Sequence, residues 1–382
     1  MSIPMPHPLA IVAVDIGGTK TTAGAVAEAG LRAQDEAVLR VSATRQIATP
    51  RVRPSSFYDA IAALVRQVRA DAERAGLAVL PLIGVAHPGR FLPDGSLARG
   101  TTPNLGELPG AFDGIHPAQE LSRRLDGADV VAENDAIAQM RFGVHALLQD
   151  AALRPHLANE TVVYLGPGTG LGGGVARVAA DGTVTPATDG QFFDLQLPGG
   201  LTAEELFAGP AIARAVSAAN AQLAAPIHPA RAGGLDQVLC DPMSAPEQRA
   251  TAERLADAHG EILATLIETI HAGAITKVRL ERLADGRILR HADEPDRAWS
   301  AADRAIVRGA RRFILGGFVG TSLGLGPRVR DRALAALRQR GLGAIEIFQI
   351  PVDSADAGLL GAAYAIPDDR VKNCKQAAAR AR

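Results

Sequence analysis

The feature that most constrains the fold is a pattern that occurs twice along the chain. An apolar run, a glycine-rich turn and a second β-prone run follow one another in Ile11–Val26, which contains DIGGTK, and in Thr161–Val178, which contains GPGTGLGGG. Each occurrence is followed by segments that alternate between strand-like and helix-like periodicity. A duplicated α/β domain with mixed sheets has this order of elements, and we predict that architecture.

The first half should form domain 1, residues 1–150. Short connections between its first three β-prone runs favour antiparallel neighbours. A helix capped by Ser55 or Ser56 should end near Gly76, because apolar residues recur at helical spacing between them. The predicted strands are Ile11–Val14, Thr21–Val26, Glu36–Val41, Val79–Ala86 and Ala128–Asn134.

A polar link near Asp150–Glu160 leads to domain 2, residues 151–354, where the pattern starts again. We expect a long helix around residues 255–270, strands within Arg311–Phe318 and Ile345–Val352, and a last helix over Ala355–Ile366. The polar stretch 278–301 is interpreted as a hairpin-like insertion of unknown purpose. The charged tail 367–382 is expected to fray.

Composition excludes several classes of protein. The chain has 382 residues with 40 basic and 41 acidic side chains, so no overall field attracts nucleic acid or an anionic membrane, and we expect neither as a partner. Cys240 and Cys374 are far apart and give no disulfide framework. Because the start MSIPMPHPLAIVAVD lacks a basic region and no apolar run reaches about 18 residues, a soluble cytoplasmic protein is expected.

The second glycine turn offers two interpretations. Gly168, Gly170 and Gly173 have the spacing of a dinucleotide fingerprint, but that motif requires a helix next, and GVARVAA is β-prone. Glycines between two strands form either a flexible hairpin or a phosphate cradle, since a backbone without Cβ atoms can approach an anion closely.

Duplicated domains would place the two glycine hairpins on opposite sides of a cleft, where they could hold the phosphates of a nucleotide. The alternative for the first hairpin is a simple tight turn, in which Asp and Gly are common. In the phosphate interpretation Asp15 binds Mg²⁺ through water, because this cation prefers oxygen ligands. The remaining predicted contacts are Gly17, Gly18, Thr19 and Lys20, then Gly168, Thr169 and Gly170.

A carboxylate at the end of a predicted strand, Asp135 in VVAENDAIAQM, is a candidate catalytic group. It could serve as the N-cap of the following helix. It could also be a general base that accepts the proton of a hydroxyl attacking phosphorus, with Asn134 binding a neighbouring hydroxyl.

The long polar loop in Gly84–Gly106 is a candidate substrate loop, because loops of this length in compact domains are usually functional. The amide of Asn104 could both donate to and accept from a vicinal diol. His87 and Arg90 are interpreted as structural or rim residues.

With these motifs in order, the chain resembles the ROK family of sugar kinases within the actin/hexokinase/Hsp70 ATPase superfamily. The resemblance covers nearly the whole chain. It is carried by DIGGTKT (Asp15–Thr21), PNL (Pro103–Leu105), ENDA (Glu133–Ala136), GPGTGLGGG (Gly166–Gly174), ILGG (Ile314–Gly317) and ADAGLLGAAYA (Ala355–Ala365).

The resemblance implies duplicated ribonuclease H-like domains of the actin-like ATPase type with a cleft between them. It also implies that residues 355–382 supply a helix returning to the first domain, plus a tail, and that the chain forms a homodimer. For the site it implies that Asp135 is the catalytic base, that Asn104 contacts the sugar and that Gly316 and Gly317 lie near the adenosine of ATP.

One segment departs from the family pattern. Members typically carry G-E-x-G-H and then C-x-C-G-x-x-G-C, whose His and three Cys bind a structural zinc. Thr188–Ile212, the equivalent stretch, contains no cysteine, so we predict no zinc site. Gln191 and Asp194 replace the Glu and His that contact sugar in the family, and are the substrate contacts predicted here.

The sequence therefore predicts an ATP- and Mg²⁺-dependent kinase that phosphorylates a hydroxyl, expected to be primary, of a hexose or hexose-like substrate. A modified sugar, an amino sugar or a cyclitol is the alternative, since the substituted positions leave the substrate open. An alternative from another class is a non-catalytic sugar-binding regulator. The family's repressors carry an N-terminal DNA-binding extension, which is not expected here.

Overall fold

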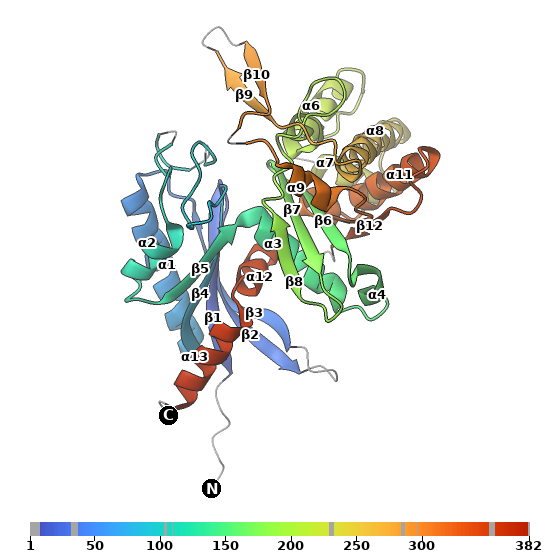
Figure 1. Ribbon diagram of the computed structural model, residues 1–382. Helices are drawn as coiled ribbons and strands as arrows, with labels where there is room; N and C mark the ends of the chain where they lie inside the picture. Colours follow the sequence, from blue (N-terminus) through green and yellow to red (C-terminus); the bar gives the residue numbers. More distant parts are fainter. Residues whose placement is uncertain are drawn as a thin grey trace. The chain divides into compact units, whose positions relative to one another are not determined.

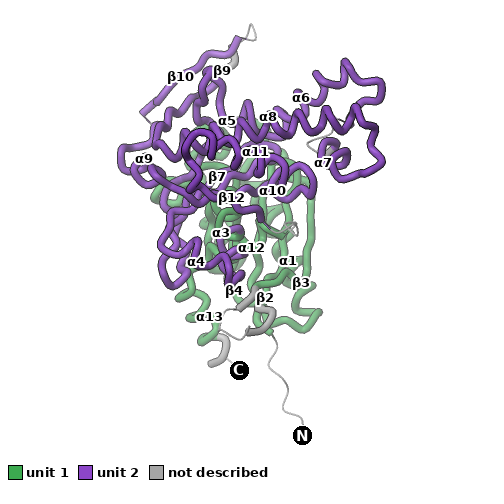
Figure 2. Tube along the Cα trace, turned by 90° about the vertical axis from the view of Figure 1, so that its right-hand side faces the viewer, with its two compact units in different colours: residues 1–142, 355–382 green, residues 143–354 purple. Residues whose placement is uncertain are grey.

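The computed structural model describes residues 8–31, 37–102, 105–108, 110–228, 233–283, 287–295, 297–350 and 356–380. The chain divides into two compact units. Unit 1 combines residues 1–142 with residues 355–382, and unit 2 contains residues 143–354 (Figure 2). The predicted domain boundaries at residues 150 and 354 stay predictions.

Unit 1 is built on a five-stranded sheet with the order β3-β2-β1-β4-β5. β2 pairs antiparallel with both β1 and β3, whereas β1, β4 and β5 run parallel to one another. The antiparallel prediction for the first three strands is confirmed. Its strands are β1 (Leu9–Ile16), β2 (Lys20–Leu31), β3 (Ala37–Ala48), β4 (Ala78–His87) and β5 (Asp129–Asn134); its helices are α1 (Pro54–Arg74), α2 (Pro117–Arg124), the start of α3 (Asp135–Leu148), α12 (Ala357–Tyr364) and α13 (Asp368–Arg380).

Alternation along β1 gives this sheet two apolar faces. Val12, Val14 and Ile16 are fully buried in the core beneath α1. Ile11 and Ala13 point to the other face, in the core that α12 covers. Strand side chains alternate between faces, and Figure 1 accordingly shows α1 and α12 on opposite sides of β1 and β4.

Glycine allows α12 to lie very close to the sheet. A Cβ on Gly84 of β4 would collide with the backbone of Ala362, and one on Gly361 would collide with the backbone of Ala138 in α3. Small residues at these contacts therefore fix the last part of the chain against the first unit. The tail expected to fray instead forms α13, whose Val371 and Cys374 pack on the same core.

The start of α1 differs from the prediction. The helix begins at Pro54, and Arg53 takes the N-cap position, so Ser55 and Ser56 lie inside the first turn. Proline suits this first helical position, because its fixed φ is already helical and an N–H there has no partner within the helix.

Unit 2 repeats the topology of unit 1. Its five-stranded sheet has the order β12-β11-β6-β7-β8, in which β6, β7 and β8 are antiparallel neighbours and β6, β11 and β12 are parallel. β6 thus corresponds to β1 and β7 to β2, so the predicted duplication with mixed sheets is confirmed. The strands are β6 (Thr161–Pro167), β7 (Leu171–Val178), β8 (Val184–Thr188), β11 (Arg312–Leu315) and β12 (Glu346–Gln349).

Helices α8 and α11 lie side by side over this second sheet (Figure 1). Leu263, Leu266 and Val329 bury their side chains in the same core as Phe313 and Leu315 of β11. The helices of unit 2 are α4 (Arg154–Leu157), α5 (Ala203–Phe207), α6 (Gly209–Asn220), α7 (Gly233–Cys240), α8 (Pro246–His271), α9 (Ala301–Val307), α10 (Gly317–Thr321) and α11 (Leu325–Gln339), besides the end of α3.

The stretch interpreted as an insertion forms the antiparallel pair β9 (Val278–Arg282) and β10 (Ile288–Ala292). The hairpin-like prediction is confirmed. Throughout the described part of the chain, none of the helices combines the length and the apolar character that crossing a bilayer requires.

Candidate functional site

In unit 1 the parallel strands bring three predicted site segments to one edge of the sheet. Asp15 pairs in register with Ala86 of β4, and Ala86 pairs with Glu133 of β5. His87 and Asn134 follow as the next register pair, and Asp135 comes directly after β5. Ligands of open α/β sheets bind outside the carboxyl ends of such strands, and these residues end β1, β4 and β5.

Asp15 carries a perturbed carboxyl group. Its pKa is raised to about 6, chiefly by burial and also by the negative charge of Asp135, while Lys20 opposes the rise. A Cβ on Gly358, in the first turn of α12, would collide with the Asp15 carboxylate. Glycine at this position therefore makes room for the acid, and the structure brings Asp15 and Asp135 close enough to interact.

The turn that follows Asp15 is held by a threonine. Gly17 N–H donates to the Lys20 carbonyl oxygen at 2.9 Å, and Thr49 Oγ1 donates to the Gly17 carbonyl oxygen at 2.6 Å. Thr19 and Lys20 are exposed at the tip, while Gly18 is partly exposed. The first hairpin therefore presents the predicted phosphate contacts to solvent on a fixed turn.

Asp135 begins α3 without being its cap. Asn134 Oδ1 accepts the N–H groups of Ala136 at 3.0 Å and Ile137 at 3.3 Å, so Asn134 caps the helix. Asp135 Oδ1 accepts from Ala136 N–H at 2.9 Å and from Asn134 Nδ2 at 3.1 Å. Burial raises the pKa of Asp135 to about 6, with these hydrogen bonds opposing the rise.

The amide of Asn134 is engaged within the protein. Besides capping α3 through Oδ1, it donates from Nδ2 to the Gly89 carbonyl oxygen at 2.9 Å. It therefore ties the loop after β4 to the start of α3. The predicted substrate contact of Asn134 stays a prediction, and that of Asn104 falls on a residue outside the described part of the chain.

His87 has a structural role at the start of the loop that follows β4. Its side chain is fully buried, and burial lowers its pKa to about 4, so the ring is neutral near pH 7. Nδ1 lies 2.6 Å from the Pro88 carbonyl oxygen and must donate to it, which leaves Nε2 to accept from the Tyr58 hydroxyl at 3.0 Å. The structural interpretation of His87 follows from these contacts.

The glycine hairpin of unit 2 joins β6 to β7. Gly168 N–H donates to the Gly170 carbonyl oxygen, and Gly209 N–H at the start of α6 donates to the Gly168 carbonyl oxygen, both at 2.8 Å. Thr169 is exposed between them. Because β7 rather than a helix follows, the fingerprint of a dinucleotide-binding turn is excluded here, as the sequence predicted.

The ILGG motif lies against this hairpin. Gly317 has φ +58°, and a Cβ on it would collide with the backbone of Gly166 and Pro167. Its N–H donates to the Tyr164 hydroxyl at 3.2 Å, and the Tyr164 ring fills the space where a Cβ of Gly316 would lie. The structure therefore brings the predicted adenosine-side glycines against the end of β6, next to the second glycine turn.

Sequence reasoning missed one residue that contacts this hairpin, Glu204 of α5. Its Oε2 accepts Leu171 N–H at 3.0 Å and lies against Gly170, and burial raises its pKa. Thr202 and Glu205 form a capping box that starts α5 and places Glu204 in the first turn. The sequence TAEE carries that capping signal, which could have located the helix start but not its contact with the hairpin.

The predicted substrate contacts of Gln191 and Asp194 stay predictions, but the structure gives Asp194 a partner within the protein. Asp194 is buried and forms an ion pair with Lys277, which also donates to the Gln191 carbonyl oxygen. A carboxylate neutralised in this way offers no charge to a substrate. Among the described residues, no group of three or more His, Cys, Asp or Glu side chains is placed to hold a metal ion.

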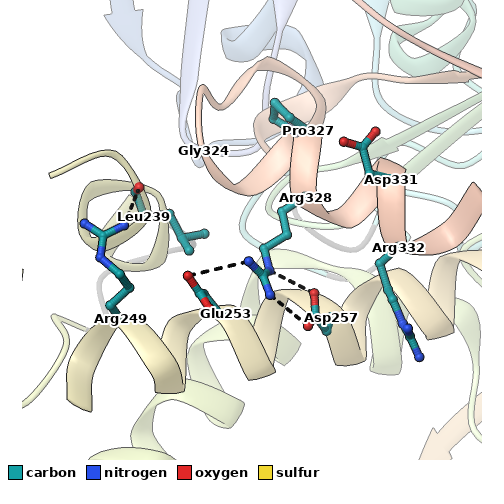
Figure 3. A pocket seen from close by; sticks show the side chains of 9 residues that line it. All are labelled: Leu239, Arg249, Glu253, Asp257, Gly324, Pro327, Arg328, Asp331 and Arg332. Atoms are coloured by element: carbon teal, nitrogen blue, oxygen red, sulfur yellow. Dashed lines mark hydrogen bonds and ion pairs between the residues drawn. The ribbon is translucent and has the colours of Figure 1, made fainter. Parts of the chain in front are cut away.

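A groove of about 570 Å³ lies between α8 and α11, in a different part of unit 2 (Figure 3). Arg328 makes a bidentate pair with Asp257 at 2.8 and 2.9 Å and lies 3.6 Å from Glu253. Two further lining charges have partners outside the groove, because Asp331 pairs with Arg330 and Arg332 pairs with Glu261. None of the predicted site residues lines the groove.

The architecture is the two-domain actin-like ATPase fold, and solved structures that share it include ROK-family sugar kinases. ROK hexokinase from Thermus thermophilus is 24% identical with a TM-score of 0.56, over 95% of this chain and 99% of that one. A ROK family glucokinase from Streptomyces griseus, solved with glucose and AMPPNP, is 22% identical with a TM-score of 0.57, over 93% and 98%.

A ROK family transcriptional regulator, a homologue of the E. coli MLC protein, also has this fold, at 13% identity and a TM-score of 0.59 over 94% of this chain and 78% of that one. At these identities the likeness establishes the fold. Comparisons with protein-family models and with curated protein sequences give no match.

Proposed function

We propose that this chain is an ATP-dependent kinase that transfers the γ-phosphoryl group to a hydroxyl of a hexose or hexose-like substrate. The observation that carries the proposal is Asp135, which stands at the carboxyl ends of β1, β4 and β5 with a pKa near 6. The alternative role considered for Asp135, the N-cap of α3, is filled by Asn134. A carboxylate of this pKa is ionised at neutral pH and still basic enough to accept a hydroxyl proton.

In this reaction Asp135 removes the proton from the attacking hydroxyl as the oxygen bonds to phosphorus and the bond to the leaving phosphate breaks. Lys20, which interacts with Asp15, is the cation nearest these acids in the predicted phosphate turn. Phosphoryl transfer requires mainly positioning and neutralisation of charge, which these groups supply.

The acids of unit 1 fit a divalent cation. Asp15 and Asp135 repel each other, and burial raises the pKa of both, so a cation would relieve an unfavourable charge. Asp15 would hold Mg²⁺ through water, and the bound ion would neutralise charge on the phosphates.

Unit 2 supplies the nucleotide contacts in this proposal. The backbone of Gly168, Thr169 and Gly170 would cradle phosphates, and Gly316 and Gly317 would lie beside the adenosine. Glu204 keeps the hairpin in place through Leu171.

For the substrate we favour a neutral hexose or a cyclitol. The carboxylate of Asp194 could pair with the ammonium of an amino sugar, but it is already paired with Lys277. A homodimer and a cytoplasmic location stay predictions, the first of which light scattering would check.

The test is ADP production from ATP and Mg²⁺ with and without hexoses, aminohexoses and cyclitols. The kinase proposal predicts ADP only in the presence of a phosphorylated acceptor. Turnover that no acceptor changes would indicate a simple ATPase instead. Sugar binding by calorimetry without turnover would favour the regulator alternative, whose fold this chain also shares.

A further inference from the structure

Lys277 buries its ammonium group at the base of the β9–β10 hairpin, where its side chain is 2% exposed. Nζ forms an ion pair with Asp194, which is 6% exposed, and donates to the Gln191 carbonyl oxygen. It also lies 5.6 Å from the centre of the Trp299 ring and 5.9 Å from that of Phe193. Burying a charge is costly without such partners, so the cluster is built around this ammonium.

The main chain joins the same two segments. Val278 N–H donates to the Asp194 carbonyl oxygen, and Gln196 N–H donates to the Thr276 carbonyl oxygen, both at 2.8 Å. Residues 276–278 therefore hold residues 191–196 through backbone and side chain together.

Trp299 adds a third segment to this cluster. Its Nε1–H donates to Asp189 Oδ1 at 3.0 Å, and its ring centre lies 5.4 Å from that of Phe192. Gly190 lies between Asp189 and Phe192 in the sequence and packs directly on β7. A Cβ on Gly173 of β7 would collide with the Gly190 carbonyl oxygen. The cluster thus fixes a segment that lies directly on the strand leaving the glycine hairpin.

A second route leads from the cluster to the hairpin tip. Glu204 N–H donates to the Phe193 carbonyl oxygen at 3.0 Å, and Ala203 N–H donates to the Leu195 carbonyl oxygen at 2.8 Å, so the start of α5 is bound to residues 193–195. Glu204 Oε2 in turn accepts Leu171 N–H at 3.0 Å, next to Gly170.

We propose that Lys277 is a positioning residue for the nucleotide-phosphate hairpin Gly168–Gly170. It acts through residues 191–195 and through Glu204, and it touches neither substrate. The inference rests on the proposed kinase function and adds to it the group that determines how well the hairpin is held for ATP.

The decisive variant is Lys277→Met combined with Asp194→Asn, which removes both charges, because replacing a buried pair by uncharged side chains often leaves stability unchanged. With the sugar saturating, we expect KM for ATP to rise about tenfold while the melting temperature stays near that of the wild type. Lys372→Met, at an exposed lysine of α13, is the matched control and should leave KM unchanged.

A second measurement needs no variant. Trp299 is the only tryptophan of the chain, so its emission reports on this cluster alone. We expect a non-hydrolysable ATP analogue with Mg²⁺ to change that emission in the wild type, with a midpoint equal to the dissociation constant from calorimetry.

The outcomes separate the two proposals. Suppose that the wild type phosphorylates a sugar. An unchanged KM for ATP in the folded double variant, or nucleotide binding that leaves Trp299 emission unaltered, would then overturn the role of Lys277 but not the kinase proposal. Absence of both nucleotide binding and phosphorylation in the wild type would overturn the kinase, and the role of Lys277 with it.

Discussion

The two units treat buried charge in opposite ways. In unit 1, Asp15 and Asp135 carry like charges near each other, and burial raises the pKa of each to about 6. In unit 2, Lys277 and Asp194 carry opposite charges, and the ammonium gains further contacts with a carbonyl oxygen and two aromatic rings.

The difference indicates a chemical role for the acids of unit 1 and a structural role for the ion pair of unit 2. Carboxylates kept at an unfavourable pKa cluster at functional sites, because a base must hold its proton neither too weakly nor too tightly. A neutralised buried pair instead holds segments of backbone together, and removing one member leaves an uncompensated charge. Substitutions at the charged groups of each unit test this contrast.

Asp135→Asn should reduce kcat by about 10²–10⁴-fold, the contribution typical of a general base. Sugar affinity, measured by calorimetry, should change little, because the amide has nearly the same shape. Asp129→Asn at the start of β5, where the carboxylate is 42% exposed, is the matched control and should keep the wild-type rate. An Asp135→Asn variant with near-normal turnover would show that this carboxylate is not the base.

Lys277→Met alone should lower the free energy of unfolding by about 3 kcal/mol, because Asp194 remains buried and keeps only Arg297, 4.0 Å away, as a cationic partner. Thermal melting followed by circular dichroism measures the loss, and addition of Asp194→Asn should recover most of it. If the single variant melts like the wild type, water or Arg297 compensates the charge of Asp194, and the buried Lys277–Asp194 pair does not have the architectural role assigned to it.

The fold was predictable because its signals are local. Alternating apolar residues and the Asp-Gly turn of Asp15–Lys20 mark a hairpin, and the same pattern in Thr161–Val178 marks its duplicate. The α13 helix was missed because its sequence is charged and its apolar contacts, through Val371 and Cys374, are few.

The site was predictable only where a motif carries it. Asp15 lies near the carboxyl end of β1 and Asp135 directly follows β5, so parallel pairing of β1, β4 and β5 brings them to the same end of the sheet. Lys277 and Asp194 are 83 residues apart, and no local pattern joins them. The hydrogen bonds that make Asn134 the cap depend on side-chain orientation, which a sequence with adjacent Asn and Asp leaves open.

The pKa of Asp15, about 6, lies above the ordinary value of an aspartate, so the ionised carboxylate destabilises the folded protein at pH 7. Asp15→Asn removes this charge and should stabilise the protein at pH 7 by about 1–3 kcal/mol, a range that allows for the partial exposure of the side chain. A folded pKa above the unfolded value means that the native state binds the proton more tightly, so the wild type loses stability as pH rises from about 4 to 6. Melting temperatures of both proteins should therefore converge at pH 4 and diverge by pH 7. Equal curves throughout would mean that Asp15 ionises as a solvated acid does.

The phosphorylation rate of the wild-type protein should rise with pH through about 6, because Asp135, the proposed base, must be ionised to accept a proton. Below that value kcat/KM should fall about tenfold per pH unit, or more steeply where Asp15 titrates as well. The profile is measured at saturating Mg²⁺, and a rate that is flat between pH 5 and 7 would contradict the assignment of the base.

The smallest effect is expected at an exposed ion pair of unit 1. Arg370 of α13 and Asp129 lie 2.6 Å apart, and their side chains are 46% and 42% exposed. Water solvates both charges well, so Arg370→Ala should change the free energy of unfolding by only about 0–1 kcal/mol. The loss should disappear in about 1 M salt, where the Debye length falls to about 3 Å.

This pair completes the contrast, because it has the opposite charges of Lys277 and Asp194 without their burial. Val371 and Cys374 keep α13 on the sheet core whether or not Arg370 is present. If Arg370→Ala destabilised the protein as strongly as Lys277→Met, in high salt as in low, opposite charge rather than burial would account for both pairs. A small, salt-sensitive change beside a large, salt-insensitive one instead identifies burial as the property that makes Lys277 part of the architecture.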